Sequence, residues 1–287
     1  MVAAEISTPL SHEDRFVRPG GIALGTTRWP GTRRGAVFAH GFGQTRGAWA
    51  SSAQAIAAAG FGCVSFDARG HGDSTWRGSA PYRFEDMADD LRAIAATFET
   101  RPVLVGASMG GLLGLAAQDQ APAPFAALIL VDVTPRWEVR GVERILGFMR
   151  AYPDGFASVQ QASEAIANYL PHRSGRKSPQ GLRSLLVDRG DGRLRWHWDP
   201  RLLDDVAVGS ASYQPMLEQA ARRLDVPTLL ISGSDSDIVS RATIDEFLAL
   251  APRARHVVVP NATHMVAGDD NAVFTSHMLE FLASLER

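Results

Sequence analysis

The sequence predicts an α/β fold in which a mostly parallel central sheet of about eight strands is flanked by helices on both faces. The main observation is that short apolar runs, bounded by glycine or proline, alternate with longer segments of helical period. The second is that a chain of 287 residues with 45% hydrophobic composition is long enough to bury a large core. Together these features favour one compact unit built from crossover connections.

The expected elements follow from this alternation. Six apolar runs predict strands, at residues 35–40, 61–67, 102–107, 127–133, 227–232 and 255–260. Six segments of helical period lie among them, at residues 48–59, 84–98, 109–120, 213–224, 241–250 and 272–285. An antiparallel pair is expected to precede them over 15–29, because Pro19, Gly20 and Gly21 supply a turn.

The alternation breaks between residue 133 and the helix expected at 213. This stretch has amphipathic helical segments and no apolar strand, and it is too long for a plain loop in a compact domain. We therefore expect an inserted helical cap at 134–206 on a core formed by 1–133 and 207–287. The cap carries a small excess of basic residues, which is typical of a solvated face.

Composition argues against several classes of partner. A formal net charge of −2 provides no basic field for nucleic acid, and no apolar run approaches the roughly 20 residues that span a bilayer. The first residues are acidic where a signal peptide needs a basic start, so we expect a cytoplasmic protein. We expect it to be a monomer or a homodimer. The single cysteine, Cys63, lies in an apolar run and is expected to be a core residue.

One serine stands in a glycine-rich stretch directly after an expected strand. Residues 106–110, GASMG, fit the pattern G-x-S-x-G between the strand at 102–107 and the helix that begins at Met109. Such a sharp turn strains the backbone at the serine and leaves no room for flanking side chains, which explains the glycines. The turn would raise the Ser108 hydroxyl to the carboxyl end of the sheet, beside the first amides of a helix.

A serine nucleophile needs a base, and the base needs an orienting carboxylate. Asp235 and Asp237 follow the strand expected at 227–232, and His264 follows the last strand. Of the eight histidines, only His264 lies in a loop between the last strand and the last helix. The chain order is therefore Ser, Asp, His, with either aspartate as the acid.

Residues 40–43, HGFG, have the H-G-x-G form expected of a loop that supplies an oxyanion donor. The backbone amide of Phe42 would act with that of Met109 on the oxygen of a tetrahedral intermediate. We expect His40 to brace this loop by hydrogen bonding. The polar stretch DARGHGDS, 67–74, is interpreted as a rigid loop whose charges satisfy one another, and no metal site is predicted.

Taken together, these motifs resemble those of the α/β-hydrolase superfamily over nearly the whole chain. The segments HGFG, DARGHGDS, GASMGG, LVDVTPR, GSDSDIV and THMVAGDDNAVF occur in the order typical of that family. The resemblance is greatest to a bacterial subgroup of hydrolases, esterases and cofactor-free haloperoxidases, although Thr263 stands where the family usually has glycine.

The resemblance implies a cofactor-free hydrolase with Ser108 as nucleophile and His264 as base and acid. It favours Asp237 as the orienting acid, because in many relatives the acid precedes an apolar pair such as Ile238 and Val239. Asp235 is the alternative.

The nucleophile narrows the chemistry that the resemblance implies. Related epoxide hydrolases and haloalkane dehalogenases have aspartate where this chain has Ser108, so acyl chemistry on a small, largely hydrophobic ester or lactone is expected. Alternatives are cleavage of carbon–carbon bonds, peracid formation by a cofactor-free perhydrolase or haloperoxidase, and a small-ligand receptor with slow hydrolysis. The residues expected to bind substrate are aromatic: Phe42, Trp137, Trp196 and Trp198.

Overall fold

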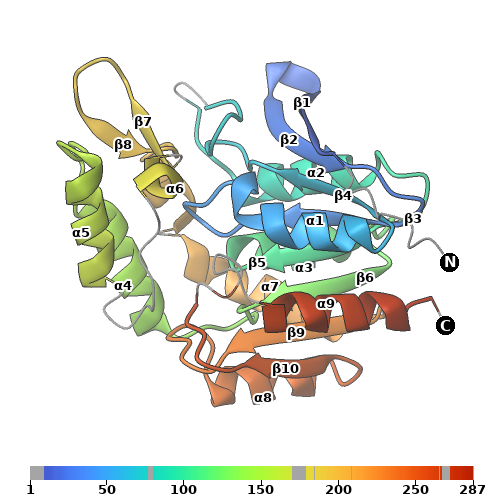
Figure 1. Cartoon of the computed structure of the whole chain (residues 1–287). Helices are drawn as coiled ribbons and strands as arrows, with labels where there is room; N and C mark the ends of the chain where they lie inside the picture. The colour runs from blue at the N-terminus through green and yellow to red at the C-terminus, as the bar shows by residue number, and fades with distance from the viewer. Residues whose placement is uncertain are drawn as a thin grey trace, which may run out of the picture.

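Eight strands form a single sheet in the computed structural model, which describes residues 10–76, 80–169, 179–183, 185–207, 209–264, 266 and 272–286 (Figure 1). The spatial order is β1-β2-β4-β3-β5-β6-β9-β10. β2 pairs antiparallel with β1 and with β4, and the remaining pairs are parallel. The strands are β1 His12–Val17, β2 Ala23–Trp29, β3 Arg33–Ala39, β4 Phe61–Phe66, β5 Val103–Ala107, β6 Ala127–Val131, β9 Thr228–Gly233 and β10 Arg255–Val259. The predicted fold class and the early antiparallel pair are confirmed.

Helices cover both faces of the sheet. On one face lie α2 Phe84–Ala95, α3 Met109–Gln118, α7 Gln214–Arg222 and α8 Arg241–Leu250. On the other lie α1 Ala50–Ala58 and α9 Ala272–Ser284. All six helices occur where helical periodicity predicts them, with ends that differ by a few residues.

Two hydrophobic cores result from the alternation of side chains along the strands. In β3, Val37 and Ala39 belong to the core beneath α2 and α3, whereas Ala36 and Phe38 belong to the core beneath α1 and α9. Cys63 packs in the second core, as expected, and burial raises the pKa of its thiol to about 12. This thiol therefore stays protonated and unreactive at neutral pH.

The segment between β6 and α7 departs from the strand–helix rhythm, as the sequence predicts. It contains α4 Val139–Arg150, α5 Val159–Tyr169, α6 Pro179–Arg183, β7 Leu186–Asp188 and β8 Leu194–Trp196. It lies beside one end of the sheet, opposite the two chain termini (Figure 1). The antiparallel pair of β7 and β8 was not expected, because strands of three residues are too short to produce a visible alternation.

The described part of the chain includes no helix with the length and apolar character needed to cross a bilayer.

The start of α3 packs against the end of β3 so closely that a side chain at Gly110 has no space. A Cβ built there would lie 2.2 Å from the carbonyl oxygen of Ala39. We expect Gly110→Ala to destabilise the fold by about 2 kcal/mol or more. At Gly147, in the exposed face of α4, a Cβ meets nothing within 4 Å, so Gly147→Ala should stabilise by about 0.5–1 kcal/mol. Urea unfolding of both variants tests this difference, and equal midpoints would contradict it.

Candidate active site

Ser108 occupies the turn between β5 and α3 in a conformation that L-amino acids rarely adopt. Its φ is 46° and its ψ is −116°. The backbone is held there because the Ser108 N–H donates to the carbonyl oxygen of Val131 (3.0 Å). A Cβ at Gly106 would lie 2.7 Å from the backbone of Gly110, which explains one of the two flanking glycines. Strain maintained by its surroundings is typical of functional residues.

His264 pairs with Asp132, which follows β6. Nδ1 of His264 lies 2.7 Å from Oδ2 of Asp132, and the two side chains are 15% and 1% exposed. Because an ionised carboxylate only accepts, the shared proton belongs to Nδ1, and Nε2 of His264 is left as the basic nitrogen.

Two further donors hold the Asp132 carboxylate. The Gly233 N–H donates to Oδ1 (2.9 Å), and the Ser236 hydroxyl donates to Oδ2 (2.6 Å). The Asp132 backbone has a φ of 47°, and its N–H donates to the carbonyl oxygen of Ile231 on β9 (2.7 Å). The turn after β6 is therefore tied to the end of β9, and the buried carboxylate accepts three hydrogen bonds, from Gly233, Ser236 and His264.

The expectation that Asp237, or else Asp235, orients His264 is wrong. Asp237 points to α4, where its Oδ2 lies 3.3 Å from Nη1 of Arg144. Asp235 accepts a hydrogen bond from the Ser234 hydroxyl (3.2 Å). The end of β9 and the loop after it instead supply donors to the Asp132 carboxylate.

The sequence does mark Asp132 as one candidate for the partner of His264. It follows five consecutive buried apolar residues in β6, just as Ser108 follows the five buried residues of β5. β5 and β6 are neighbours in the sheet, so both residues emerge at the same edge.

The loop that follows β3 is braced by two buried histidines. The Ala68 N–H donates to Nε2 of His40 (2.9 Å), and the Gly43 N–H donates to Nε2 of His71 (3.1 Å). Each ring therefore has its proton on Nδ1, which faces the carbonyl oxygen of Gly41 in His40 (2.8 Å) and of Arg69 in His71 (3.3 Å). His40 thus braces the loop as expected, and His71 is an additional brace that sequence reasoning missed.

Burial lowers the pKa of His40, and it lowers the pKa of His71 well below its ordinary value. In both cases desolvation is the largest cause. Their mutual proximity, with ring centroids 4.9 Å apart, further lowers the pKa of His71. Both rings are consequently neutral, as the hydrogen bonds they accept require.

The charges of the 67–74 loop are satisfied mainly from outside it. Asp67 accepts from the backbone and the guanidinium of Arg46, and from the Asp73 N–H (3.0 Å). Arg69 makes a two-pronged contact with Asp90 of α2, at 2.7 and 2.8 Å. Within the described ranges, no group of three or more potential ligands is arranged to hold a metal ion.

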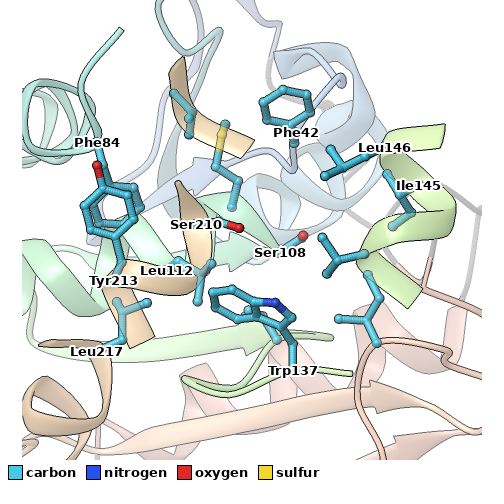
Figure 2. Close-up of a pocket in the computed structure, with 15 residues that line it drawn as sticks. Phe42, Phe84, Ser108, Leu112, Trp137, Ile145, Leu146, Ser210, Tyr213 and Leu217 are labelled. Carbon is cyan, nitrogen blue, oxygen red and sulfur yellow. The ribbon is translucent and has the colours of Figure 1, made fainter. Parts of the chain in front are cut away.

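Ser108 lies in the wall of an apolar cavity of about 110 Å³ (Figure 2). In the close-up the stacked rings of Phe84 and Tyr213 lie on one side of Ser108, and Ile145 and Leu146 of α4 lie on the other. Among the residues that the structure describes, none that lines the cavity is charged: Phe42, Phe84, Ser108, Met109, Leu112, Val133, Trp137, Val142, Ile145, Leu146, Val206, Ser210, Tyr213, Leu217 and Ile238. The cavity can hold an apolar group against the hydroxyl of Ser108, whose backbone is strained.

Two of the four aromatic residues expected to bind substrate line this cavity, namely Phe42 and Trp137. Trp196 and Trp198 do not; they line a second cavity. Trp196 belongs to β8, and that short hairpin holds it away from Ser108. Phe84 and Tyr213 were not foreseen as lining residues because both lie in regular amphipathic helical patterns that indicate core packing.

The comparison with known proteins agrees with the observed fold. Residues 37–270 match the family model described as the alpha/beta hydrolase fold. An sn-1-specific diacylglycerol lipase of Mus musculus is 28% identical over 94% of this chain and 88% of its own length. An esterase of Mycobacterium tuberculosis is 28% identical over 93% of this chain and 87% of its own length.

Among solved structures, E-2-(acetamidomethylene)succinate hydrolase superposes with a TM-score of 0.82 at 23% identity. The superposition covers 96% of this chain and 100% of the hydrolase chain. Because the family model matches residues 37–270, well over half of its length, the chain belongs to the α/β-hydrolase family.

Proposed function

We propose that the protein is a serine hydrolase that cleaves a small, largely hydrophobic carboxylic ester or lactone through an acyl-enzyme on Ser108. The observation that supports this most directly is the pairing of His264 with a buried carboxylate at the edge of the sheet where Ser108 emerges. The uncharged cavity beside Ser108 supports an apolar substrate. The esterase and lipase relatives support the same reaction class.

In the proposed mechanism, Nε2 of His264 accepts the Ser108 hydroxyl proton while Oγ attacks the substrate carbonyl carbon. Asp132 holds the Nδ1 proton and stabilises the imidazolium that forms. The tetrahedral intermediate then collapses, and His264 returns the proton to the departing alcohol. Water, deprotonated by the same nitrogen, hydrolyses the acyl-enzyme and releases the acid.

The oxyanion of each intermediate would be bound by the backbone amides of Phe42 and Met109. Met109 is the first residue of α3, where N–H groups have no partner within the helix. Phe42 directly precedes Gly43, whose own N–H is held by His71. Fixing Gly43 in this way orients the preceding peptide, and donors that are already oriented are those that lower a barrier most.

We also propose that the segment 134–206 is a cap on a hydrolase core formed by 1–133 and 207–287. Ile145 and Leu146, which line the Ser108 cavity across from the core residues Phe84 and Tyr213, support this division. On this account the cap selects the substrate, and the core performs the reaction.

A fluorophosphonate probe and a series of 4-nitrophenyl esters of increasing chain length test the proposed function. We expect the wild type to be labelled once per chain and to turn over the esters many times. Ser108→Ala should lose labelling and lower kcat/KM by roughly 10³-fold or more. Equal rates for wild type and variant would refute the mechanism. Binding of an ester with release of at most one equivalent of alcohol would instead indicate a receptor.

The buried neutral His71 predicts a pH dependence of stability. The pKa of His71 in the folded protein lies well below its ordinary value of 6.5. Below about pH 6.5 the unfolded chain therefore binds a proton at His71 that the folded protein does not bind. The stabilisation associated with the neutral ring is complete above about pH 6.5 and is lost as the pH falls. We expect the melting temperature of the wild type to drop between pH 7 and pH 5, and the drop to be smaller in His71→Gln.

Gln is the informative replacement because its carbonyl oxygen can still accept from Gly43. His71→Leu should show the same shallower pH dependence with lower stability at pH 8, since it leaves the Gly43 N–H without an acceptor, at a cost of about 1–3 kcal/mol. An unchanged pH dependence in both variants would show that His71 does not titrate on unfolding.

A further inference from the structure

A second cavity, of about 350 Å³, lies in the inserted segment. Its walls come from the C-terminal end of α4, the loop after it, the β7–β8 hairpin and residues 198–204. The lining includes the rings of Trp196 and Trp198. It also includes three guanidinium groups, those of Arg150, Arg189 and Arg195, against one carboxylate, that of Asp204.

This cavity shares two elements with the Ser108 cavity. On α4, Leu146 lines the Ser108 cavity and Arg150, one turn further along, lines the second cavity. On the helical segment Leu203–Ala207, Val206 lines the first cavity and Leu203 the second. The two spaces therefore follow one another along the same walls.

The partition between the two cavities is formed by side chains in and next to residues 40–43, the loop proposed to supply an oxyanion donor. The rings of Phe42 and Trp198 lie 5.9 Å apart, with Phe42 facing the first cavity and Trp198 the second. A Cβ at Gly43 would lie 2.6 Å from Cε of Met149 and 3.6 Å from Nε1 of Trp198. Met149 also lines the second cavity. Because a methionine side chain is unbranched and changes rotamer readily, this partition can open to a substrate that spans both spaces.

The two cavities differ in charge. No charged group from the described part of the chain lines the Ser108 cavity. In the second, Arg195 is neutralised by a two-pronged contact with Asp191, at 2.6 and 2.8 Å, and Arg150 lies 3.7 Å from Asp204. Arg189 stacks its guanidinium on Trp76, 4.3 Å from the ring centre, and forms no ion pair with a carboxylate in the described ranges. Its planar donors are thus positioned by the stack and available to an anion.

We propose that the second cavity binds the anionic group, a carboxylate or a phosphate, of an amphiphilic ester whose apolar part occupies the Ser108 cavity. This inference deepens the proposed function and rests on it for the reaction at Ser108. Arg189 supplies a fork that matches either anion, and Arg150, beside Asp204, is a second guanidinium in the lining. The class of substrate is therefore an ester with one apolar and one anionic end.

The test compares hexanoate esters of four alcohols: benzyl alcohol, 4-(hydroxymethyl)benzamide, 4-(hydroxymethyl)benzoic acid and 4-(hydroxymethyl)phenyl phosphate. Calorimetry with Ser108→Ala measures binding without turnover, and kcat/KM of the wild type is measured in parallel at low salt. We expect the carboxylate or the phosphate ester to bind about tenfold more tightly than the uncharged benzamide ester. Whichever anion gives the larger gain identifies the natural group.

Arg189→Gln, alone and combined with Arg150→Gln, should remove this advantage. Arg253→Gln is the matched control, because Arg253 is exposed in the turn before β10, at the opposite end of that strand from His264, and it should keep the advantage. Equal affinity of the charged and benzamide esters would overturn the inference, as would an advantage that survives in Arg189→Gln.

This experiment distinguishes a failure of the proposed anion site from a failure of the proposed esterase reaction. If the neutral esters are turned over and depend on Ser108 but charge has no effect, the proposed function stands and the anion site is refuted. If no ester is turned over but the charged ester binds more tightly in an Arg189-dependent way, the anion site stands and the esterase reaction is refuted.

Discussion

The hydrogen bond between Asp132 and His264 is the interaction on which the rest of the site depends. It joins the end of β6 to the loop after β10, across the intervening strand β9. The carboxylate cannot move toward solvent, because Gly233 and Ser236 donate to it from the β9 side. Since Nδ1 is committed to this bond, only Nε2 is available for proton transfer. The geometry of one buried carboxylate therefore fixes both the tautomer and the orientation of the His264 ring.

The second constraint is that neutral histidines position residues 40–43, the loop that we propose supplies an oxyanion donor. His40 and His71 accept hydrogen bonds that a protonated ring could not accept, so the loop depends on their burial. The 67–74 loop is in turn linked to the inserted segment, where Gly72 N–H donates to the carbonyl oxygen of His197 and Asp199 N–H donates to that of Gly70. The proposed cap and the proposed oxyanion donors thus share one connected set of hydrogen bonds.

Local sequence patterns were sufficient for the fold and for locating Ser108 directly after β5 and His264 in the loop after β10, because each position depends on what directly precedes and follows it. The carboxylate that pairs with His264 could not be identified from local patterns. Asp132, Asp235 and Asp237 all satisfy the chain order Ser, Asp, His, and all three follow an apolar strand. Which carboxylate meets His264 is decided by the sheet order and by the left-handed backbone at Asp132, neither of which has a local sequence signal. That Trp196 and Trp198 line the second cavity and not the Ser108 cavity was not foreseen for a similar reason, because the short hairpin that positions Trp196 has no visible alternation.

The most direct test of this account compares Asp132→Asn with Asp237→Asn in the hydrolysis of one 4-nitrophenyl ester. The low-field proton resonance of His264 Nδ1 serves as a readout of the hydrogen bond itself. The account predicts that Asp132→Asn lowers kcat/KM by about 10³- to 10⁴-fold and removes the resonance. Asp237→Asn, which changes only an ion pair with Arg144, should retain the resonance and remain within a few-fold of the wild type. Full activity in Asp132→Asn together with loss of activity in Asp237→Asn would contradict the account.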